Sequence, residues 1–389
     1  MCESTGYCSF DDVKCPSGRR YGSGASASLR DACVNGTAWY VATTGDDQNV
    51  GTADSPFLTV ARGVGAAQPG DTIIVEDGTY GPGSAGSAEF AVDIDRAGTA
   101  DQPFTLRAHH LWGAVLDCEQ QCHSYIGLHA KAAYWIIDGF QIVGGYWGGI
   151  YSNDSGGSNV TISHNQFHDI GHGGDNTSLE EVAVFTNGSA SDYIIDGNTF
   201  FNIGVTSRGA NAFDPEIGTA GQRMTITNNV FYRALDGWAI QLQTGFSGTI
   251  ASNTFSGPNM FPDKPGQIML SGATGDIAIT DNIFAGALDN ALESSGWTPG
   301  GACAVDHNLV FGASLTSTTG TQVASACTIT STLGQTDPMF VDPTSGDFHL
   351  RAGSPAIDAA IAVAGVRADL DGECRPQGKA PDLGAFEHP

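Results

Sequence analysis

An eight-residue motif recurs through the middle of the chain. It has hydrophobic residues at alternate positions, then an Asn, and ends in a Phe. The copies are "VTISHNQF" (160–167), "YIIDGNTF" (193–200), "MTITNNVF" (224–231), "GTIASNTF" (248–255), "IAITDNIF" (277–284) and a weaker "AVDHNLVF" (304–311). An earlier copy, "WIIDGFQI" (135–142), has Phe140 in place of the Asn. The aligned asparagines lie 24 to 33 residues apart and are Asn165, Asn198, Asn229, Asn253, Asn282 and Asn308.

Each copy reads as a strand, a turn at the Asn and a short second strand. Irregular spacing between copies indicates a fixed strand unit with loops of varying length, which is typical of a solenoid. Asn tolerates left-handed backbone and bonds locally, so stacked asparagines would form an internal ladder. A propeller or a sandwich fits less well, because each unit is too short to pair with itself.

A third strand precedes each motif. The segments are "YIGLHA" (125–130), "GIYSND" (149–154), "VAVFTN" (182–187), "FDPEIG" (213–218), "WAIQLQ" (238–243), "QIMLSG" (267–272) and "ALESSG" (291–296). Alternation directs one set of side chains inward. The inward set is Ile126, Leu128, Ile150, Ile240, Leu242, Ile268, Leu270 and Leu292.

The outward positions of these strands form two columns. The first contains Gly127, Tyr151, Ala183, Asp214, Gln241, Met269 and Glu293, and the second contains His129, Asn153, Phe185, Glu216, Gln243, Ser271 and Ser295. Neighbouring coils lie about 4.8 Å apart. The polar members of both columns are therefore expected on one surface.

The segment before the repeats predicts a helix over 56–67, with Ser55 as N-cap, Pro56 at the first helical position and Pro69-Gly70 ending it. Such a helix would cover an open sheet end, which otherwise invites aggregation. We divide the chain into a Cys-rich segment (1–36), a solenoid (37–335) and a C-terminal tail or cap (336–389).

Charge and composition narrow the function. The net charge is −26, with only 16 Lys and Arg against 42 Asp and Glu. Such a field repels phosphate backbones, so nucleic-acid binding is not expected. It also repels anionic polysaccharides unless cations such as Ca²⁺ intervene. No window holds 18 apolar residues, so no membrane span is predicted. We expect a monomer.

The nine cysteines indicate an oxidising compartment. Four fall within the first 33 residues, where no hydrophobic periodicity supports a fold, so disulfides are the natural explanation. The odd count leaves one thiol, which we expect at Cys374. The start at Met1-Cys2 is read as a mature form with an added Met, and a lipid anchor on Cys2 is the alternative.

The repeat, together with "GDTIIVEDGTY" before it, resembles right-handed parallel β-helix proteins of the polysaccharide lyase-like (pectin lyase-like) superfamily. The tail, "DPMFVDPTSGDFHLRAGSPAID" followed by "ADLDGECRPQGKAPDLGAFE", resembles the C-terminal segment of secreted bacterial β-helix proteins. Residues 1–36 resemble Cys-rich segments of secreted or surface proteins of myxobacteria. These resemblances imply an all-β, extracellular bacterial protein.

In β-helix polysaccharide lyases and hydrolases, the outward face described above carries the active groove. Asp214 and Glu216 resemble the Ca²⁺-binding pair of the alginate lyase and chondroitinase B family. With Asn153 or Asn187 as a further oxygen ligand, they would hold Ca²⁺. The ion would neutralise a uronate carboxylate and acidify the C5 proton for β-elimination.

One feature of that family is missing. A Lys is expected a few residues after the acidic pair, and an Arg in the next coil, but Gly221 or Gln222 stands near the Lys position. Arg223 or Arg233 would substitute for it, or His129, Lys131 or Tyr151 would supply the base.

Further residues are expected to bind substrate beside the pair. They are Asn153, Gln241, Gln243, His168, His172, Arg208 and Lys264, with Trp147 and Trp238 as sugar-stacking platforms. Long loops on one side of a solenoid usually form the walls of a cleft.

The sequence thus predicts a Ca²⁺-assisted lyase that cleaves a uronate-containing glycan. Two alternatives remain open. An inverting glycoside hydrolase would use Asp214 and Glu216 as acid and base, since such enzymes place two carboxyls about 6.5–9.5 Å apart. A glycan-binding or adhesin β-helix would use the same face without catalysis.

Overall fold

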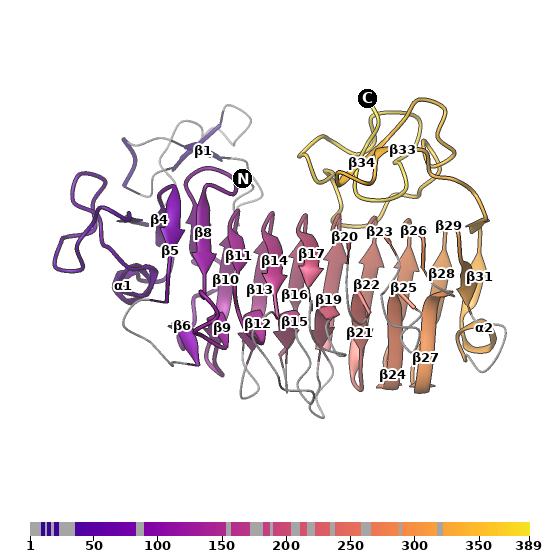
Figure 1. Cartoon of the computed structure of the whole chain (residues 1–389), viewed down its shortest axis with the longest axis horizontal. Coiled ribbons are helices and arrows are strands. Elements are labelled where there is room, and N and C mark those ends of the chain that lie inside the picture. Colours follow the sequence, from indigo (N-terminus) through magenta and orange to yellow (C-terminus); the bar gives the residue numbers. More distant parts are fainter. Residues whose placement is uncertain are drawn as a thin grey trace.

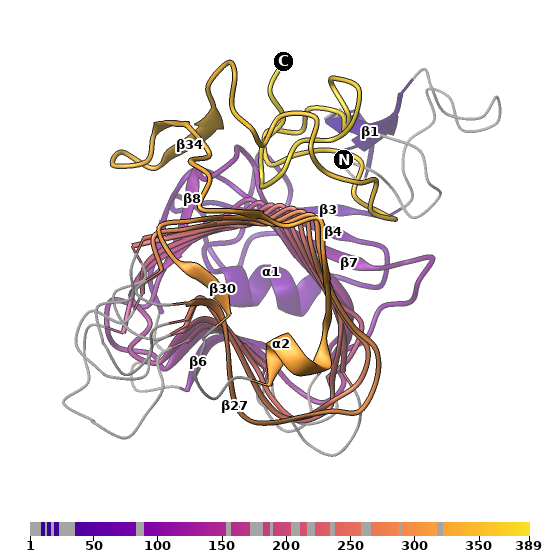
Figure 2. The same ribbon diagram turned by 90° about the vertical axis from the view of Figure 1, so that its right-hand side faces the viewer.

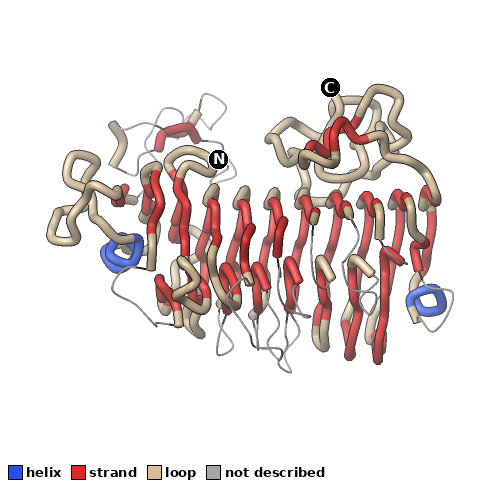
Figure 3. Tube along the Cα trace, in the orientation of Figure 1, coloured by secondary structure: helices blue, strands red, loops and turns tan. Residues whose placement is uncertain are grey.

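The computed structural model describes residues 9–11, 14–16, 19–22, 36–82, 89–152, 157–171, 182–186, 190–203, 211–215, 222–233, 238–257, 266–287, 290–316 and 322–389. The side chains of 9–11, 21, 211–215 and 222 are outside this description. The chain winds into a parallel β-helix, in which successive coils stack along one axis (Figures 1 and 3). The predicted all-β solenoid is therefore confirmed.

Three parallel sheets, named A, B and C here, form the sides of the coil in the described residues. Sheet A consists of β3 (Ala38–Val41), β4 (Thr72–Val75), β7 (Phe104–Ala108), β10 (Ala133–Asp138), β13 (Ser158–Ser163), β16 (Tyr193–Asp196), β19 (Gln222–Thr227), β22 (Phe246–Ala251), β25 (Ile277–Thr280), β28 (Cys303–Asp306) and β31 (Thr328–Thr330). Sheet B consists of β5 (Gly78–Tyr80), β8 (Ala114–Asp117), β11 (Gln141–Val143), β14 (Gln166–Ile170), β17 (Thr199–Ile203), β20 (Val230–Tyr232), β23 (Thr254–Ser256), β26 (Ile283–Ala285), β29 (Leu309–Phe311) and β32 (Leu333–Gly334). Sheet C consists of β6 (Phe90–Ile94), β9 (Ser124–Leu128), β12 (Gly148–Ser152), β15 (Val182–Thr186), β18 (Asn211–Pro215), β21 (Ile240–Leu242), β24 (Ile268–Thr274), β27 (Asn290–Pro299) and β30 (Ser314–Thr316).

The repeat motif forms the corner between sheets A and B. Its asparagines are fully buried and form the predicted ladder, in which each side-chain amide donates to the carbonyl oxygen of the next Asn at 2.9–3.1 Å. Each of these oxygens also accepts the backbone N–H of the preceding ladder residue. At the degenerate copy, the N–H of Phe140 donates to Asn165 at 2.9 Å. The ladder thus satisfies backbone groups that water cannot reach.

The left-handed backbone is not at the ladder asparagines themselves, contrary to our expectation. It is at the residue before each one, as in His164 (φ 52°), Asn228 (φ 54°) and Asp281 (φ 57°). The left-handed residue makes the turn, which leaves the next side chain pointing inward along the ladder.

The phenylalanines that end the motif form a second stack inside the coil. Phe167, Phe200, Phe231, Phe255 and Phe284 lie with ring centroids 4.8–5.0 Å apart and nearly parallel planes. This spacing equals the distance between coils, so one ring per coil fills the interior without a gap. The eight residues predicted to point inward from sheet C are also completely buried.

A helix is present where one was predicted, but it is shorter. Helix α1 runs from Val60 to Ala66, and the hydroxyl of Thr59 caps it by accepting the N–H of Arg62. Ser55 and Pro56 were therefore wrong as the start. They lie in the segment where Phe57 bridges to β3, which keeps that stretch extended. Figure 2 shows α1 across one end of the coil. Its role as a cap stays a prediction.

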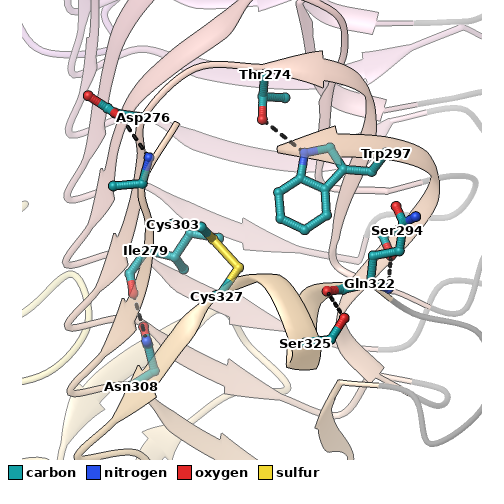
Figure 4. The surroundings of a disulfide bond; sticks show 11 residues. Thr274, Asp276, Ile279, Ser294, Trp297, Cys303, Asn308, Gln322, Ser325 and Cys327 are labelled. Carbon is teal, nitrogen blue, oxygen red and sulfur yellow. Dashed lines mark hydrogen bonds between the residues drawn. A yellow bond between two sulfur atoms is a disulfide. The ribbon is translucent and has the colours of Figure 1, made fainter. Parts of the chain in front are cut away.

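Disulfides occur at both ends of the solenoid. Cys118 pairs with Cys122, and Cys303 pairs with Cys327 directly after the short helix α2 (Val323–Ala326), as Figure 4 shows. The second bond links β28 to the following coil beside the buried Trp297. Cys374 is free and exposed among the described cysteines, as expected. No helix in the described chain is long and apolar enough to span a membrane.

Two short antiparallel pairs complete the structure, β1 (Ser9–Asp11) with β2 (Arg19–Tyr21), and β33 (Phe340–Asp342) with β34 (Asp347–Leu350). The segment carrying β33 and β34 folds back over the outside of sheet B (Figure 1). Its Phe348, Leu350 and Phe386 form a hydrophobic cluster with Val230 and Ile283 of the solenoid. The domain limits that we drew from the sequence stay predictions.

Asp281 is the buried acid at the contact between solenoid and C-terminal segment. Its side chain accepts the N–H of Ile361 at 3.1 Å, and its backbone carbonyl accepts that of Gly384 at 2.8 Å. The second carboxyl oxygen, Oδ2, has no partner among the described residues. Burial raises the pKa of Asp281 to about 6.

Replacing one ladder residue tests the ladder. Asn253→Ala would remove buried hydrogen bonds to Asn229, Asn282 and Ile226, and the backbone N–H of Asn229 would lose its acceptor. We expect a loss of about 3 kcal/mol or more in the free energy of unfolding, measured by urea denaturation. Thr249→Ala, on the surface of the same coil, is the control and should cost under about 0.5 kcal/mol. Equal effects would contradict the structural role of the ladder.

Asp281→Asn tests the buried acid, and Asn also tolerates its left-handed backbone. Because the folded-state pKa lies above the ordinary 3.8, the contribution of Asp281 to stability is complete below pH 3.8 and is lost as pH rises through about 6. The variant should be more stable than wild type by about 2 kcal/mol at pH 8 and nearly equal to it at pH 4. Thermal unfolding at both pH values measures this. The exposed Asp101→Asn is the control, and a pH-independent difference for Asp281→Asn would exclude titration of this group.

Candidate functional site

The outer face of sheet C carries the predicted site, and its strand pairing fixes which residues are neighbours. Tyr151 pairs with Gly127 on one side and with Phe185 on the other. Phe185 then pairs with Asp214, which stands beside Gln241 because Phe213 pairs with Ile240. The first outward column is therefore Gly127, Tyr151, Phe185, Asp214, Gln241, Met269 and Glu293.

This order corrects the predicted columns at one coil. Ala183 was expected beside Tyr151, but Phe185 occupies that place. Strand β15 starts earlier, with Val182 opposite Gly148, so its outward residues are shifted by two positions.

Aromatic rings fill the face on the N-terminal side of Asp214. The aromatic cluster consists of Phe90, His123, Trp147, Tyr151 and Phe185. Tyr151 stacks on Phe185 with centroids 4.5 Å apart and planes 6° apart, and on Phe90 at 5.9 Å. Gly127 lies between them, where a Cβ would come within 2.4 Å of the Phe90 ring. Because Gly127 has no side chain, the Phe90 ring can extend over this coil and contact Tyr151 in the next one.

These rings pack on one another, which limits what they can bind. Because Tyr151 and Phe185 stack face to face along the solenoid axis, their faces are covered and only their edges point outward. Both side chains are buried. Trp147 packs 3.9 Å from His123 and 4.8 Å from Tyr151, so it belongs to the same cluster. The cluster therefore supports the strands beside Asp214, and the role of Trp147 as a sugar-stacking platform stays a prediction.

Two polar groups of the cluster, the Trp147 indole N–H and the His123 imidazole, have no charged partner among the described residues. The indole N–H of Trp147 is buried and has no acceptor among the described residues. Burial lowers the pKa of His123 to about 4, so its imidazole is neutral at pH 7.

At the N-terminal end of the face, the predicted bases His129 and Lys131 are each paired with an acid. His129 Nε2 lies 2.7 Å from Asp93, and the Lys131 ammonium lies 3.2 Å from Asp95. The hydrogen bond from Lys131 lowers the pKa of Asp95. His129 and Lys131 stand three coils from Asp214, about 14 Å along the face.

Asp93 and Asp95 are site residues that sequence reasoning missed. Asp93 lies on β6 opposite Gly127, in the same outward column as Asp214, and Asp95 follows directly after β6. The signal was present in "FAVDID", where hydrophobic and acidic residues alternate. The third strands predicted from the sequence begin with 125–130, so this earlier segment was not among them.

On the other side of Asp214, the face is polar. Gln241 and Gln243 are half-buried at β21. The Trp238 indole donates to Glu293 at 2.8 Å, and the N–H of Gly266 donates to the same oxygen at 3.3 Å. Trp238, predicted as a sugar-stacking platform, is thus anchored by Glu293. Glu293 lies two coils beyond Gln241 in the same outward column.

Two predicted residues lie on sheet B. His168 extends from β14, where its ring stacks on Phe201 at 4.6 Å and contacts Asp169 at 2.7 Å. Arg233 follows β20, and its guanidinium donates to the carbonyl of Thr344 in the C-terminal segment. The structure therefore does not bring His168 or Arg233 together with the residues of sheet C.

The remaining predicted residues are outside the described part of the chain. These are Asn153, His172, Asn187, Arg208, Glu216 and Lys264, and for Asp214 only the backbone is described. Among the described residues, no group of three His, Cys, Asp or Glu side chains could hold a metal ion. The described neighbours of Asp214 contribute one oxygen ligand, the amide of Gln241, whereas Ca²⁺ takes six to eight oxygens.

Comparison with known proteins agrees with this architecture. The family described as Pel9A-like, right-handed β-helix region, matches residues 39–259, more than half of the chain. The chain belongs to this family. The Pel9A-like region includes the first four ladder asparagines, β18 and the aromatic cluster.

Individual relatives of this Pel9A-like chain are more distant. Pectate lyase L of Dickeya chrysanthemi is 25% identical over 199 residues, which cover 49% of this chain and 44% of that protein. Pectate lyase PEL9 of Emericella nidulans is 29% identical over 129 residues, 30% of each protein. The crystal structure of pectate lyase Pel9A superimposes with a TM-score of 0.57 at 16% identity, covering 90% of this chain and 96% of that one. The chain thus spans under half the length of these two curated relatives, and the structural match establishes the fold.

The neutral imidazole of His123 makes a testable contribution to stability. Its folded-state pKa lies below the ordinary 6.5, so this contribution is complete above pH 6.5 and is lost as pH falls toward 4. His123→Phe keeps a ring in the cluster and cannot take up a proton. We expect its melting temperature to fall less than that of wild type between pH 7 and pH 4. His110→Phe, at an exposed site, should keep the wild-type acid slope, and an unchanged slope in His123→Phe would contradict the assignment.

Proposed function

We propose that this protein is a polysaccharide lyase that cleaves a uronate-containing glycan by β-elimination on the outer face of sheet C. The observation that carries the proposal is the position of Asp214 on the central strand of this face. Strand β18 is the fifth of nine strands in the sheet as described. Membership in the Pel9A-like family and the pectate lyases among its relatives support the choice of substrate.

The location of Asp214 suits an extended polymer. Four strands lie on each side of β18, and neighbouring strands are about 4.8 Å apart, so the face extends about 19 Å in both directions. A chain lying along the solenoid axis would contact Gln241 and Gln243 on one side. On the other side it would meet the edges of Tyr151 and Phe185.

The reaction needs three contributions. A base removes the C5 proton of the uronate, the electron pair forms the C4–C5 double bond, and the bond from C4 to the glycosidic oxygen breaks. The departing oxygen takes up a proton. A positive charge beside the uronate carboxylate makes the C5 proton more acidic.

We assign charge neutralisation to Ca²⁺ held by Asp214, Glu216 and Asn187, the oxygen ligands that the sequence predicts. This would also overcome the repulsion between an acidic protein and an anionic substrate. The base is assigned to Tyr151. Of the predicted bases with described side chains on sheet C, it is nearest to Asp214, two coils or about 10 Å away. Lys131 lies one coil further away, and its ammonium is already engaged by Asp95 at 3.2 Å.

We place the activity outside the cell. Two described disulfides, Cys118–Cys122 and Cys303–Cys327, are stable in an oxidising compartment. Polysaccharide substrates of this size are met there as well.

The test is incubation of the full chain with polyuronates and neutral glycans, with and without Ca²⁺. We expect ultraviolet absorbance from an unsaturated uronate, dependent on Ca²⁺, and a loss of about a thousandfold in rate for Asp214→Ala and Glu216→Ala. Tyr151→Phe should show a similar loss with its melting temperature retained. Asp54→Ala, an exposed acid away from sheet C, is the control and should keep full activity.

Other outcomes would overturn the proposal. Reducing ends without unsaturated product would favour the inverting glycosidase instead, with Asp214 and Glu216 as its carboxyls. Full activity in Asp214→Ala would remove this residue from the mechanism. If no glycan of a broad panel is cleaved, the catalytic proposal is overturned and the glycan-binding alternative is favoured.

A further inference from the structure

A second groove lies on a different side of the solenoid, on the outer face of sheet A. It has a volume of about 940 Å³ and crosses the strands from β10 to β28. Six strand spacings make it about 29 Å long, parallel to the solenoid axis. The C-terminal segment packs on sheet B and does not contribute to its lining (Figure 2).

The groove is built from two outward columns of sheet A. The strand pairing aligns Thr161, Ile194, Thr225, Thr249, Ala278 and Ala304 as its floor. The neighbouring outward column lies two residues nearer to the start of each strand and consists of Tyr134, Asn159, Asp192, Arg223, Ser247 and Asp276.

The polar groups of this groove differ from those of the third outward column of the same sheet. In that third column, the hydroxyls of Ser163, Thr227 and Thr330 donate to aspartates of neighbouring coils at 2.6–2.7 Å. In the groove, no described residue pairs with the hydroxyls of Tyr134 and Thr225. The groove therefore presents the hydroxyls of Tyr134 and Thr225, whereas those of Ser163, Thr227 and Thr330 are already engaged by aspartates.

Arg223 is the fixed centre of the groove. Its Nε and one Nη donate to the two carboxylate oxygens of Asp192 at 2.7 and 2.8 Å, although its side chain is 71% exposed. This bidentate pair holds the guanidinium plane in place and leaves the other Nη without a partner among the described residues. The pair lowers the pKa of Asp192, so the two charges stay present and cancel.

We propose that the groove on sheet A is a second carbohydrate-binding site, which takes a neutral, extended, β-1,4-linked glycan. Hydroxyl and amide groups of Thr, Tyr and Asn match sugar hydroxyls, and the Arg223–Asp192 pair offers both a donor and an acceptor to adjacent hydroxyls. Exposed Ile194 would contact the apolar face of a sugar ring. The straight floor and the coil spacing, close to the length of one pyranose, favour an extended chain.

Charge decides between neutral and anionic glycans. With Asp192 and Arg223 cancelling, Asp276 is the remaining charged group of the lining, on a protein of net charge −26. A polyuronate would be repelled here, whereas a neutral chain would not. The site would hold the protein on a neutral polymer while sheet C acts elsewhere. The inference takes only the carbohydrate class from the proposed function.

Titration calorimetry of the full chain with cellohexaose, xylohexaose and hexagalacturonate tests the site. We expect a neutral hexaose to bind and Thr225→Trp, which fills the floor, to weaken it by at least about tenfold. Arg223→Ala should weaken it as well. Thr328→Trp is the matched control, because Thr328 continues the same outward column beyond the groove, and it should stay within about twofold of wild type.

The two proposals fail separately. Asp214→Ala should bind the neutral hexaose like wild type, and Thr225→Trp should still release unsaturated product from a soluble polyuronate. The groove proposal is overturned if neither neutral hexaose binds, or if Thr225→Trp and Thr328→Trp behave alike. Preferential binding of hexagalacturonate that is lost in Thr225→Trp would overturn the neutral class. If the protein binds a neutral hexaose but shows no β-elimination, the result contradicts the lyase site on sheet C and not the groove on sheet A.

Discussion

Register between coils is the constraint on which the whole structure depends, and buried side-chain hydrogen bonds fix it. Each ladder Asn uses its amide to join two coils and its carbonyl oxygen to satisfy the backbone of the coil before. A shift by one residue would break these bonds at every coil and expose the inward side chains. Because the Phe stack repeats at the same spacing, packing and hydrogen bonding enforce the same register.

A fixed register turns each outer face into an ordered array, and the three faces differ. On sheet C, aromatic rings pack beside the strand that carries Asp214. Sheet B is partly covered by the C-terminal segment, which engages Arg233 and encloses Asp281. Sheet A keeps an open polar groove around Arg223 and Asp192. One scaffold thus provides separate surfaces with different chemistry.

Acidic residues in the outward column of sheet C differ in the neighbours that adjacent coils give them. Asp93 and Asp95 face His129 and Lys131 of the next coil, which bind them directly. Asp214 has Phe185 and Gln241 at the corresponding positions, and neither carries a positive charge. The basic residues beside Asp93 and Asp95 are therefore not repeated in the described strands next to β18.

The sequence by itself determined the solenoid, the Asn ladder and the inward face of sheet C, because these follow from local periodicity repeated coil after coil. It also indicated Cys374 as the unpaired thiol. Tertiary structure alone decided the placement of Phe185 beside Asp214, since the start of β15 depends on pairing with β12. It likewise decided that Arg233 contacts a segment over 100 residues away. Such contacts depend on which coils and segments meet, and no pattern within one strand encodes that.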